Sequence, residues 1–254
     1  MRLPVIRGLI DRRILVNYRV DPAILAGLLP QPFTPKLIRG YGMAGICLIR
    51  LKEIRPRGLP RWMGISSENA AHRIAVEWDD GGVRREGVYV ARRDTDSRLN
   101  ALAGGRIFPG VHHHARFEVT EPGKRFEVAF RSDDQSAGAA VEAEQAESWP
   151  ANSVFDSLAE ASQFFEAGSL GYSPARGANG FDGLELRAKS WKVEPLAIRS
   201  VRSSVFDDRS RFPPGSIELD CALLMRSIEH EWHQREALSA RRRQFILEAR
   251  AESL

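Results

Sequence analysis

Three consecutive histidines, His112–His114, stand in the segment GGRIFPGVHHHARFEV, where a β-strand is expected to begin. The chain has 6 histidines, so half of them occupy this one run. An imidazole titrates near pH 6.5, can accept or donate a proton, and binds metals in its neutral form. The run is therefore compatible with acid–base catalysis, with a metal site, or with the solvated end of a strand.

Strand alternation indicates which of these histidines faces the interior. Ala115, Phe117 and Val119 share one face of the expected strand, and His113 is in phase with them. We take His113 as the first candidate for a proton-transferring group in a pocket. His112 is a second candidate, because the first residues of a strand are often irregular. For both, the alternative is an interior histidine held by a hydrogen bond, without chemistry.

One further histidine and two carboxylates could join such a pocket. His72 is in phase with the apolar residues of HRIAVEW (72–78), which predicts an inward side chain, with a core histidine that has no chemical role as the alternative. Glu68 precedes this strand and could act as a base or orient His113, with loop capping as the alternative. Glu86 is in phase with the valines of the next strand, so it is the other carboxylate that could enter the cavity.

A metal site would need ligands beyond the histidine run. His112 and His114 share a strand face, but a third ligand would have to come from elsewhere in the chain. The segment HEWH (230–233) is not the His-Glu-x-x-His motif, because its histidines are three residues apart rather than four. No glycine-rich phosphate loop has the required spacing either. We expect no metal and no organic cofactor.

Composition narrows the classes of partner. Lys+Arg 37 against Asp+Glu 33 gives a net charge of +4, and the basic residues are spread along the chain, which argues against nucleic acid as a partner. No apolar run approaches the roughly 20 residues needed to span a bilayer, so we expect no membrane insertion. Cys47 and Cys221 lie in apolar runs, as reduced core cysteines of a cytoplasmic protein do. The expected partner is a small molecule, and a homo-oligomer is left open.

The elements that must position these residues follow from periodicity and turn signals. Helices are expected at 21–30, with Asp21 as N-cap, at 95–105, at 154–168, capped by Ser153 and Asp156, and from about Glu236 to the C-terminus. Strands are expected at 12–20, 41–54, 72–78, 83–93, 113–121, 125–132, 137–145, within 183–201 and at 216–228. This order predicts an α+β fold with a closed or cone-like antiparallel sheet. Without repeats or linkers, residues 1–254 are expected to form a single domain.

Several of these segments resemble the acetoacetate decarboxylase-like superfamily, and specifically its DUF2071 branch. They are RRILVNYRVDPAILAGLLPQPF (12–33), the histidine segment, the RPRGLP loop and GVYVARRDTDSRLN, and the resemblance covers most of residues 10–230. It implies a conical antiparallel β-barrel around one small pocket. It also places Arg12, which is in phase with Ile14 and Val16, close to the substrate-carboxylate arginine of the decarboxylases, with Arg13 as the alternative one residue away. Arg106 falls on their Gly-Arg pair. Surface exposure is the alternative for Arg12, and a structural role for Arg106.

The chain departs from the decarboxylases at the residue that carries their chemistry. Their Schiff-base lysine and its neighbour fall on His112 and His113 here, and no lysine lies in the segment 106–119. A Schiff base needs a primary amine, which imidazole lacks. Decarboxylation of acetoacetate by that mechanism is therefore not expected.

Three functions remain open at this stage. The leading hypothesis is an enzyme of small carbonyl or carboxylate compounds, in which His113 or His112 transfers protons and Arg12 anchors an acidic group. The second is a binding protein that kept the pocket without the catalytic lysine. The third is a metal-dependent hydrolase built on the histidine run.

Overall fold

The computed structural model describes residues 4–105, 108–177 and 180–239 of the 254. Its strands are β1 (Ile6–Val20), β2 (Thr34–Pro35), β3 (Leu37–Ile38), β4 (Tyr41–Pro56), β5 (Ile65–Asp80), β6 (Val83–Thr95), β7 (His112–Thr120), β8 (Arg125–Ser132), β9 (Gly138–Gln145), β10 (Leu170–Pro174), β11 (Gly180–Ala188), β12 (Glu194–Ser203) and β13 (Ile217–Ser239). The helices are α1 (Pro22–Leu28), α2 (Arg98–Ala103) and α3 (Leu158–Ala167), with a 3₁₀ turn at Arg61–Met63.

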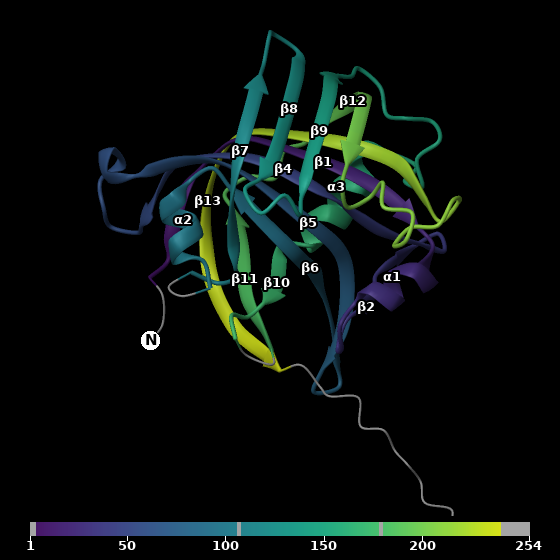
Figure 1. The fold of residues 1–254 in the computed structure, drawn as a ribbon, viewed down its shortest axis with the longest axis horizontal. Helices are drawn as coiled ribbons and strands as arrows, with labels where there is room; N and C mark the ends of the chain where they lie inside the picture. Colours follow the sequence, from purple (N-terminus) through teal and green to yellow (C-terminus); the bar gives the residue numbers. More distant parts are fainter. Residues whose placement is uncertain (1–3, 106–107, 178–179, 240–254) are drawn as a thin grey trace, which may run out of the picture.

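All thirteen strands belong to one sheet, and its pairings return to their starting strand. From β13 the pairing runs through β1, β4 and β5 to β6, and then back to β13 by two routes. One route passes through β7, β8, β9 and β12, which stand side by side at the top of Figure 1, and the other through β10 and β11. The strands β6 and β13 are therefore the junctions of the fold, since the two routes part at β6 and meet again at β13.

The two faces of the sheet carry separate apolar cores. Ile14 and Val16 belong to the larger core, whereas Leu15 between them belongs to a smaller core that also contains Phe155 and Phe165 near and on α3. This alternation is the two-residue period of a strand buried on both faces. We call the face that carries Ile14 the inner face and the face that carries Leu15 the outer face.

Most of the predicted elements are present, and the sheet is not wholly antiparallel. Strand β6 pairs in parallel with both β7 and β10. Parallel neighbours need a crossover connection, and residues 96–111 with α2 supply the one between β6 and β7. Helix α1 begins as predicted, because the Asp21 side chain accepts a hydrogen bond from the N–H of Ala23 at 2.8 Å.

Three local predictions are wrong. Strand β5 begins at Ile65, so Glu68 lies within the strand rather than before it. The N-cap of α3 is Ser157, whose hydroxyl accepts from the Glu160 N–H at 3.2 Å, while Ser153 donates to Asp220 of β13. Residues 236–239, assigned to a C-terminal helix, continue β13, and the rest of that predicted helix lies outside the described residues.

Within the described part of the chain, no helix combines the length and apolar character needed to cross a membrane.

Candidate functional site

Five consecutive strands bring the candidate residues onto the inner face. Across β1, β4 and β5 the register places Arg12 opposite Arg50, and Arg50 opposite Glu68. Four residues after Glu68 on β5, His72 lies opposite Arg92 of β6. Two groups of polar side chains result, one around Arg12 and one around Arg92.

The Arg12 group consists of two arginines that alternate with two glutamates. Arg12 is only 1% exposed, and its guanidinium donates to Glu68 at 2.6 Å and also to Glu121, which follows β7. Arg50 donates to the same two carboxylates, to Glu68 at 2.5 Å and to Glu121 at 3.0 Å. The two positive and two negative charges cancel, and each carboxylate joins both arginines. Arg12 is therefore buried, as its strand phase predicts, but both of its terminal nitrogens are already engaged.

His72 is a buried residue of the inner face, opposite Arg92 in the β5–β6 register. Its side chain is 3% exposed and lies about 6 Å, centroid to centroid, from the rings of Phe130 (6.2 Å) and Phe206 (5.9 Å). Neither ring nitrogen has a hydrogen-bond partner among the described residues. Burial, together with the positive charges of Arg92 and Arg211, lowers the pKa of His72 to about 4. The imidazole is thus neutral at pH 7.

The Arg92 group links a fully buried carboxylate to the histidine run. Arg92 donates to Asp94, at 2.8 Å for the shortest contact, and to Asp134 in the β8–β9 turn at 3.0 Å. Asp94 is 0% exposed, and burial raises its pKa although the hydrogen bond from Arg92 opposes the rise. Asp134 also contacts the histidine run, because its carboxylate lies 3.2 Å from the Nδ1 of His113. The side chain of His113 is 37% exposed, so this group opens toward solvent at His113.

His112 and His114, on either side of His113, have different surroundings. The Nδ1 of His112 lies 3.0 Å from the carbonyl oxygen of Gly110, and burial beside Arg93 lowers the pKa of His112 to about 4. A Cβ at Gly104 would come within 2.5 Å of that same Nδ1, so only glycine fits there. The Nδ1 of His114 lies 2.7 Å from Asp133. The three histidines therefore do not converge on one point.

Two other sequence candidates do not join the site. Glu86 is 44% exposed near the β5–β6 turn and pairs with Lys36 at 2.6 Å. Arg106 lies outside the described residues. Among the described residues, no group of three or more His, Cys, Asp or Glu side chains could hold a metal ion.

Sequence reasoning missed most of the partners that surround the candidates: Arg50, Arg92, Asp94, Glu121 and Asp134. The strand phase of Val88 and Val90 does not lead to Arg92 and Asp94, because Val88 lies opposite Ala75 of the outer face and the β5–β6 register shifts between Val90 and Arg92. All five partners therefore depend on strand register and on the positions of the turns, which the sequence does not reveal.

Solved structures with the same fold give the class of the protein. An acetoacetate decarboxylase-like enzyme from Sphingomonas wittichii RW1 aligns with a TM-score of 0.59 at 14% identity, covering 95% of this chain and 94% of the other. Acetoacetate decarboxylase from Legionella pneumophila aligns with a TM-score of 0.58 at 12% identity, covering 92% and 88%. The enduracididine biosynthesis enzyme MppR, in complex with pyruvate, aligns at 0.57 and 12%, covering 95% and 91%. The chain thus has the acetoacetate decarboxylase-like fold.

Within that class the family is also defined. The family model of DUF2071, described as an uncharacterized conserved protein, matches residues 10–219, and the chain belongs to this family. The resemblance expected from the sequence is therefore confirmed. A comparison with curated proteins found no match.

Proposed function

We propose that the protein is an enzyme that acts on a small carbonyl or carboxylate compound by histidine acid–base chemistry. The observation that carries the proposal is the contact between the Nδ1 of His113 and Asp134, 3.2 Å apart, on a ring that remains partly exposed. A carboxylate on one ring nitrogen fixes the tautomer and orientation of an imidazole and stabilises its protonated form. The other nitrogen of His113 is then available to a substrate.

The surrounding groups suit a proton shuttle at that nitrogen. With the proton on Nδ1 directed at Asp134, Nε2 of His113 accepts a proton from the substrate and later returns it. Arg92 holds Asp134 at 3.0 Å and so keeps the carboxylate in place through both steps. His72 stays neutral because it is buried, and it supplies a polar but uncharged wall. We also infer that the closed circuit of strand pairings is the wall of the conical barrel expected from the sequence.

The mechanism needs no Schiff base. Lys52 follows Arg50 by two residues on β4, and its Nζ lies 3.0 Å from Asp11, which in turn contacts Arg50 at 3.5 Å. An amine held as an ammonium ion by a carboxylate is a poor nucleophile, since the neutral form must attack the carbonyl.

A binding protein without catalysis is the second candidate, and one observation favours it. The charges of Arg12, Arg50, Glu68 and Glu121 neutralise one another completely. A network of this kind can also be purely structural and take no part in a reaction.

The experiment compares wild type with two single variants. Small keto acids, hydroxy acids and lactones are screened by ligand-induced melting shifts, and each hit is assayed for conversion. We expect His113→Gln to fold normally and to lose roughly 10²–10⁴-fold in rate, as for removal of a positioned acid–base group. His114→Gln, one residue away and held by Asp133, is the matched control and should keep the rate. Binding without conversion in the wild type would favour the binding protein, and conversion that survives in His113→Gln would remove His113 from the mechanism.

A further inference from the structure

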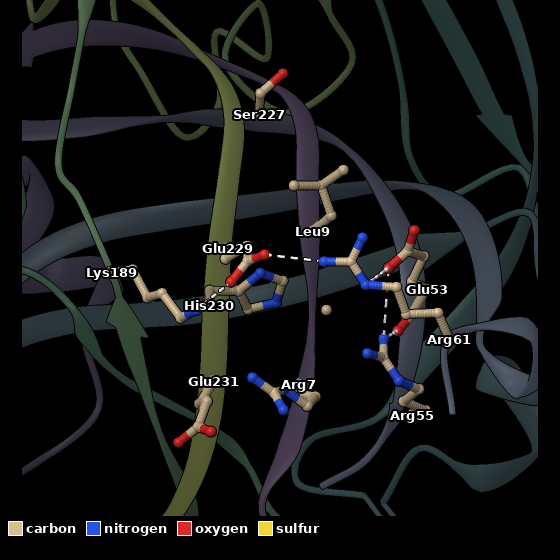
Figure 2. Close-up of a pocket in the computed structure, with 11 residues that line it drawn as sticks. Arg7, Leu9, Glu53, Arg55, Arg61, Lys189, Ser227, Glu229, His230 and Glu231 are labelled. Carbon is tan, nitrogen blue, oxygen red and sulfur yellow. Dashed lines mark hydrogen bonds and ion pairs between the residues drawn. The ribbon is translucent and has the colours of Figure 1, made fainter. Parts of the chain in front are cut away.

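A charged cavity of about 400 Å³ opens at the end of β1, away from His113. Its walls come from three adjacent strands, as Figure 2 shows: Arg7 and Leu9 of β1, Glu53 and Arg55 of β4, and Glu229 and Glu231 of β13. Arg61 and Lys189 close it from the neighbouring loops. Its volume lies within the range of about 300–1,000 Å³ that is usual for small-molecule pockets.

Two residues of the cavity wall have a backbone conformation that is uncommon outside glycine. Glu53 has φ of 56° and Ser227 has φ of 54°, and Glu53 lies where the β4–β5 register shifts. Non-glycine residues in this region cost of order 1–3 kcal/mol each and concentrate at ligand sites. The strands are thus shaped irregularly at the point where the cavity forms.

Two of the glutamates in the cavity are already paired with cations. Glu229 contacts Arg61 at 3.0 Å and also Lys189. Glu53 contacts Arg61 at 3.4 Å and Arg55 at 3.6 Å. The third, Glu231, contacts His233 at 3.1 Å and Arg57 at 3.8 Å, both of which lie outside the lining of the cavity. The carboxylates of the cavity therefore have partners other than Arg7.

Arg7 is the cation of the cavity that has no carboxylate in contact with it. Its side chain makes no hydrogen bond, and no ion pair within 4 Å, with any residue that the structure describes, and no dashed line reaches it in Figure 2. Its charge acts only from a greater distance, where it helps Lys189 to lower the pKa of Glu229.

In the β1–β4 register Arg7 lies directly opposite Arg55, and in the β1–β13 register it lies opposite Glu231, whose carboxylate contacts His233 and Arg57 instead. Like charges opposite each other on neighbouring strands are destabilising. An anion placed between the two guanidinium groups would remove that repulsion.

We propose that this cavity binds a small carboxylate, with the carboxylate group on Arg7 beside Arg55. The planar guanidinium fork matches a carboxylate with two parallel hydrogen bonds. A single unpaired cation calls for one negative charge on the ligand rather than two. Leu9 offers an apolar wall for a short hydrocarbon chain. The site shares no residue with the His113 site, so the proposal can be tested independently of the proposed enzyme activity.

The test measures binding of butyrate by isothermal titration calorimetry. Butyrate has the charge and a short chain but no carbonyl on which the proposed enzyme could act, and butyramide is its neutral isostere. We expect butyrate to bind the wild type and butyramide not to bind. Arg7→Ala should weaken butyrate binding about 10- to 100-fold, as expected for loss of a charged hydrogen-bonding partner. Arg199→Ala removes the same charge from β12, where Arg199 pairs with Glu144 at 2.9 Å, and should leave the affinity within about twofold.

Folding of the variants is checked by circular dichroism and thermal melting. If Arg7→Ala is unstable, Arg7→Lys retains the charge without the fork and should bind butyrate with intermediate affinity. The absence of butyrate binding to the wild type, equal binding of butyramide, or unchanged affinity in Arg7→Ala would each overturn the proposal. Binding that survives Arg7→Ala but is lost in His113→Gln would belong to the inner face and would also overturn it.

Discussion

Removal of the buried imidazole of His72 should make the protein less sensitive to acid. The pKa of His72 is about 4 in the folded chain, against 6.5 for an unperturbed histidine, because the ring is buried and lies near Arg92 and Arg211. A group whose pKa is lowered by folding binds more protons in the unfolded state at any pH below 6.5. Stability is therefore complete above pH 6.5 and is lost as the pH falls toward 4.

The size of the effect follows from the two pKa values. The whole drop from 6.5 to about 4 corresponds to about 3 kcal/mol, of which about 2 kcal/mol is lost between pH 7 and pH 5. Leucine at this position keeps an apolar side chain of similar size against Phe130 and Phe206 but does not titrate. At pH 7 the variant should be about as stable as wild type, since neither ring nitrogen has a hydrogen-bond partner to lose.

Urea unfolding at pH 7 and pH 5 measures this directly. The free energy of unfolding should fall by about 2 kcal/mol less in His72→Leu than in wild type over that interval. Other groups that titrate in this range, among them His112 and His230, are present in both proteins and cancel in the comparison. Ile74→Val, a non-titrating substitution on the same strand and in the same core, is the control and should leave the acid-induced loss as large as in wild type. Equal losses in wild type and His72→Leu would refute the argument from burial.

Two further predictions concern the charged groups. Glu68→Gln removes the negative charge shared by Arg12 and Arg50 and turns one of the two accepting oxygens into an amide nitrogen, so a buried arginine is left short of a partner and urea unfolding at pH 7 should show a loss of about 3–5 kcal/mol; a loss below about 1 kcal/mol would mean that water compensates Arg12. Borohydride added with pyruvate should leave the protein mass unchanged, because no lysine lies in the segment 106–119; a stable adduct on Lys52 or Lys192, found by mass spectrometry, would restore Schiff-base chemistry.

Strand phase predicted the placement of the buried candidates. Arg12 and His72 were assigned inward because their neighbours at i+2 and i+4 are apolar, and both prove to be buried. This works because a strand residue has only two directions available, and one apolar face fixes which is which. The same rule assigned His113 and His112 to opposite faces of the strand. It could not show that the face that carries His112 is covered too.

The wrong predictions occur where partners that are distant in sequence decide the structure. The segment ISSEN before His72 is polar, so it gives no strand signal, yet it pairs with β4 through Glu68 and Asn69. Residues 236–239 carry helix-forming residues, but β11 pairs with β13 there and extends the strand. Both are cases in which tertiary pairing overrides local preference.

The contrast between Arg12 and Arg7 indicates which arginine is available to an anionic ligand. Arg12 is 1% exposed, and both of its terminal nitrogens are bound to glutamates that also hold Arg50. A ligand carboxylate could bind Arg12 only by displacing Glu68 or Glu121, and a buried carboxylate left without its partner costs several kcal/mol. Arg7 has no such contact: it lies opposite Arg55 on one neighbouring strand, and the glutamate opposite it on the other, Glu231, contacts His233 and Arg57. Of these two arginines, the sequence therefore identified the one at the inner face, whereas the pairing of charges in the structure favours Arg7 for binding a carboxylate.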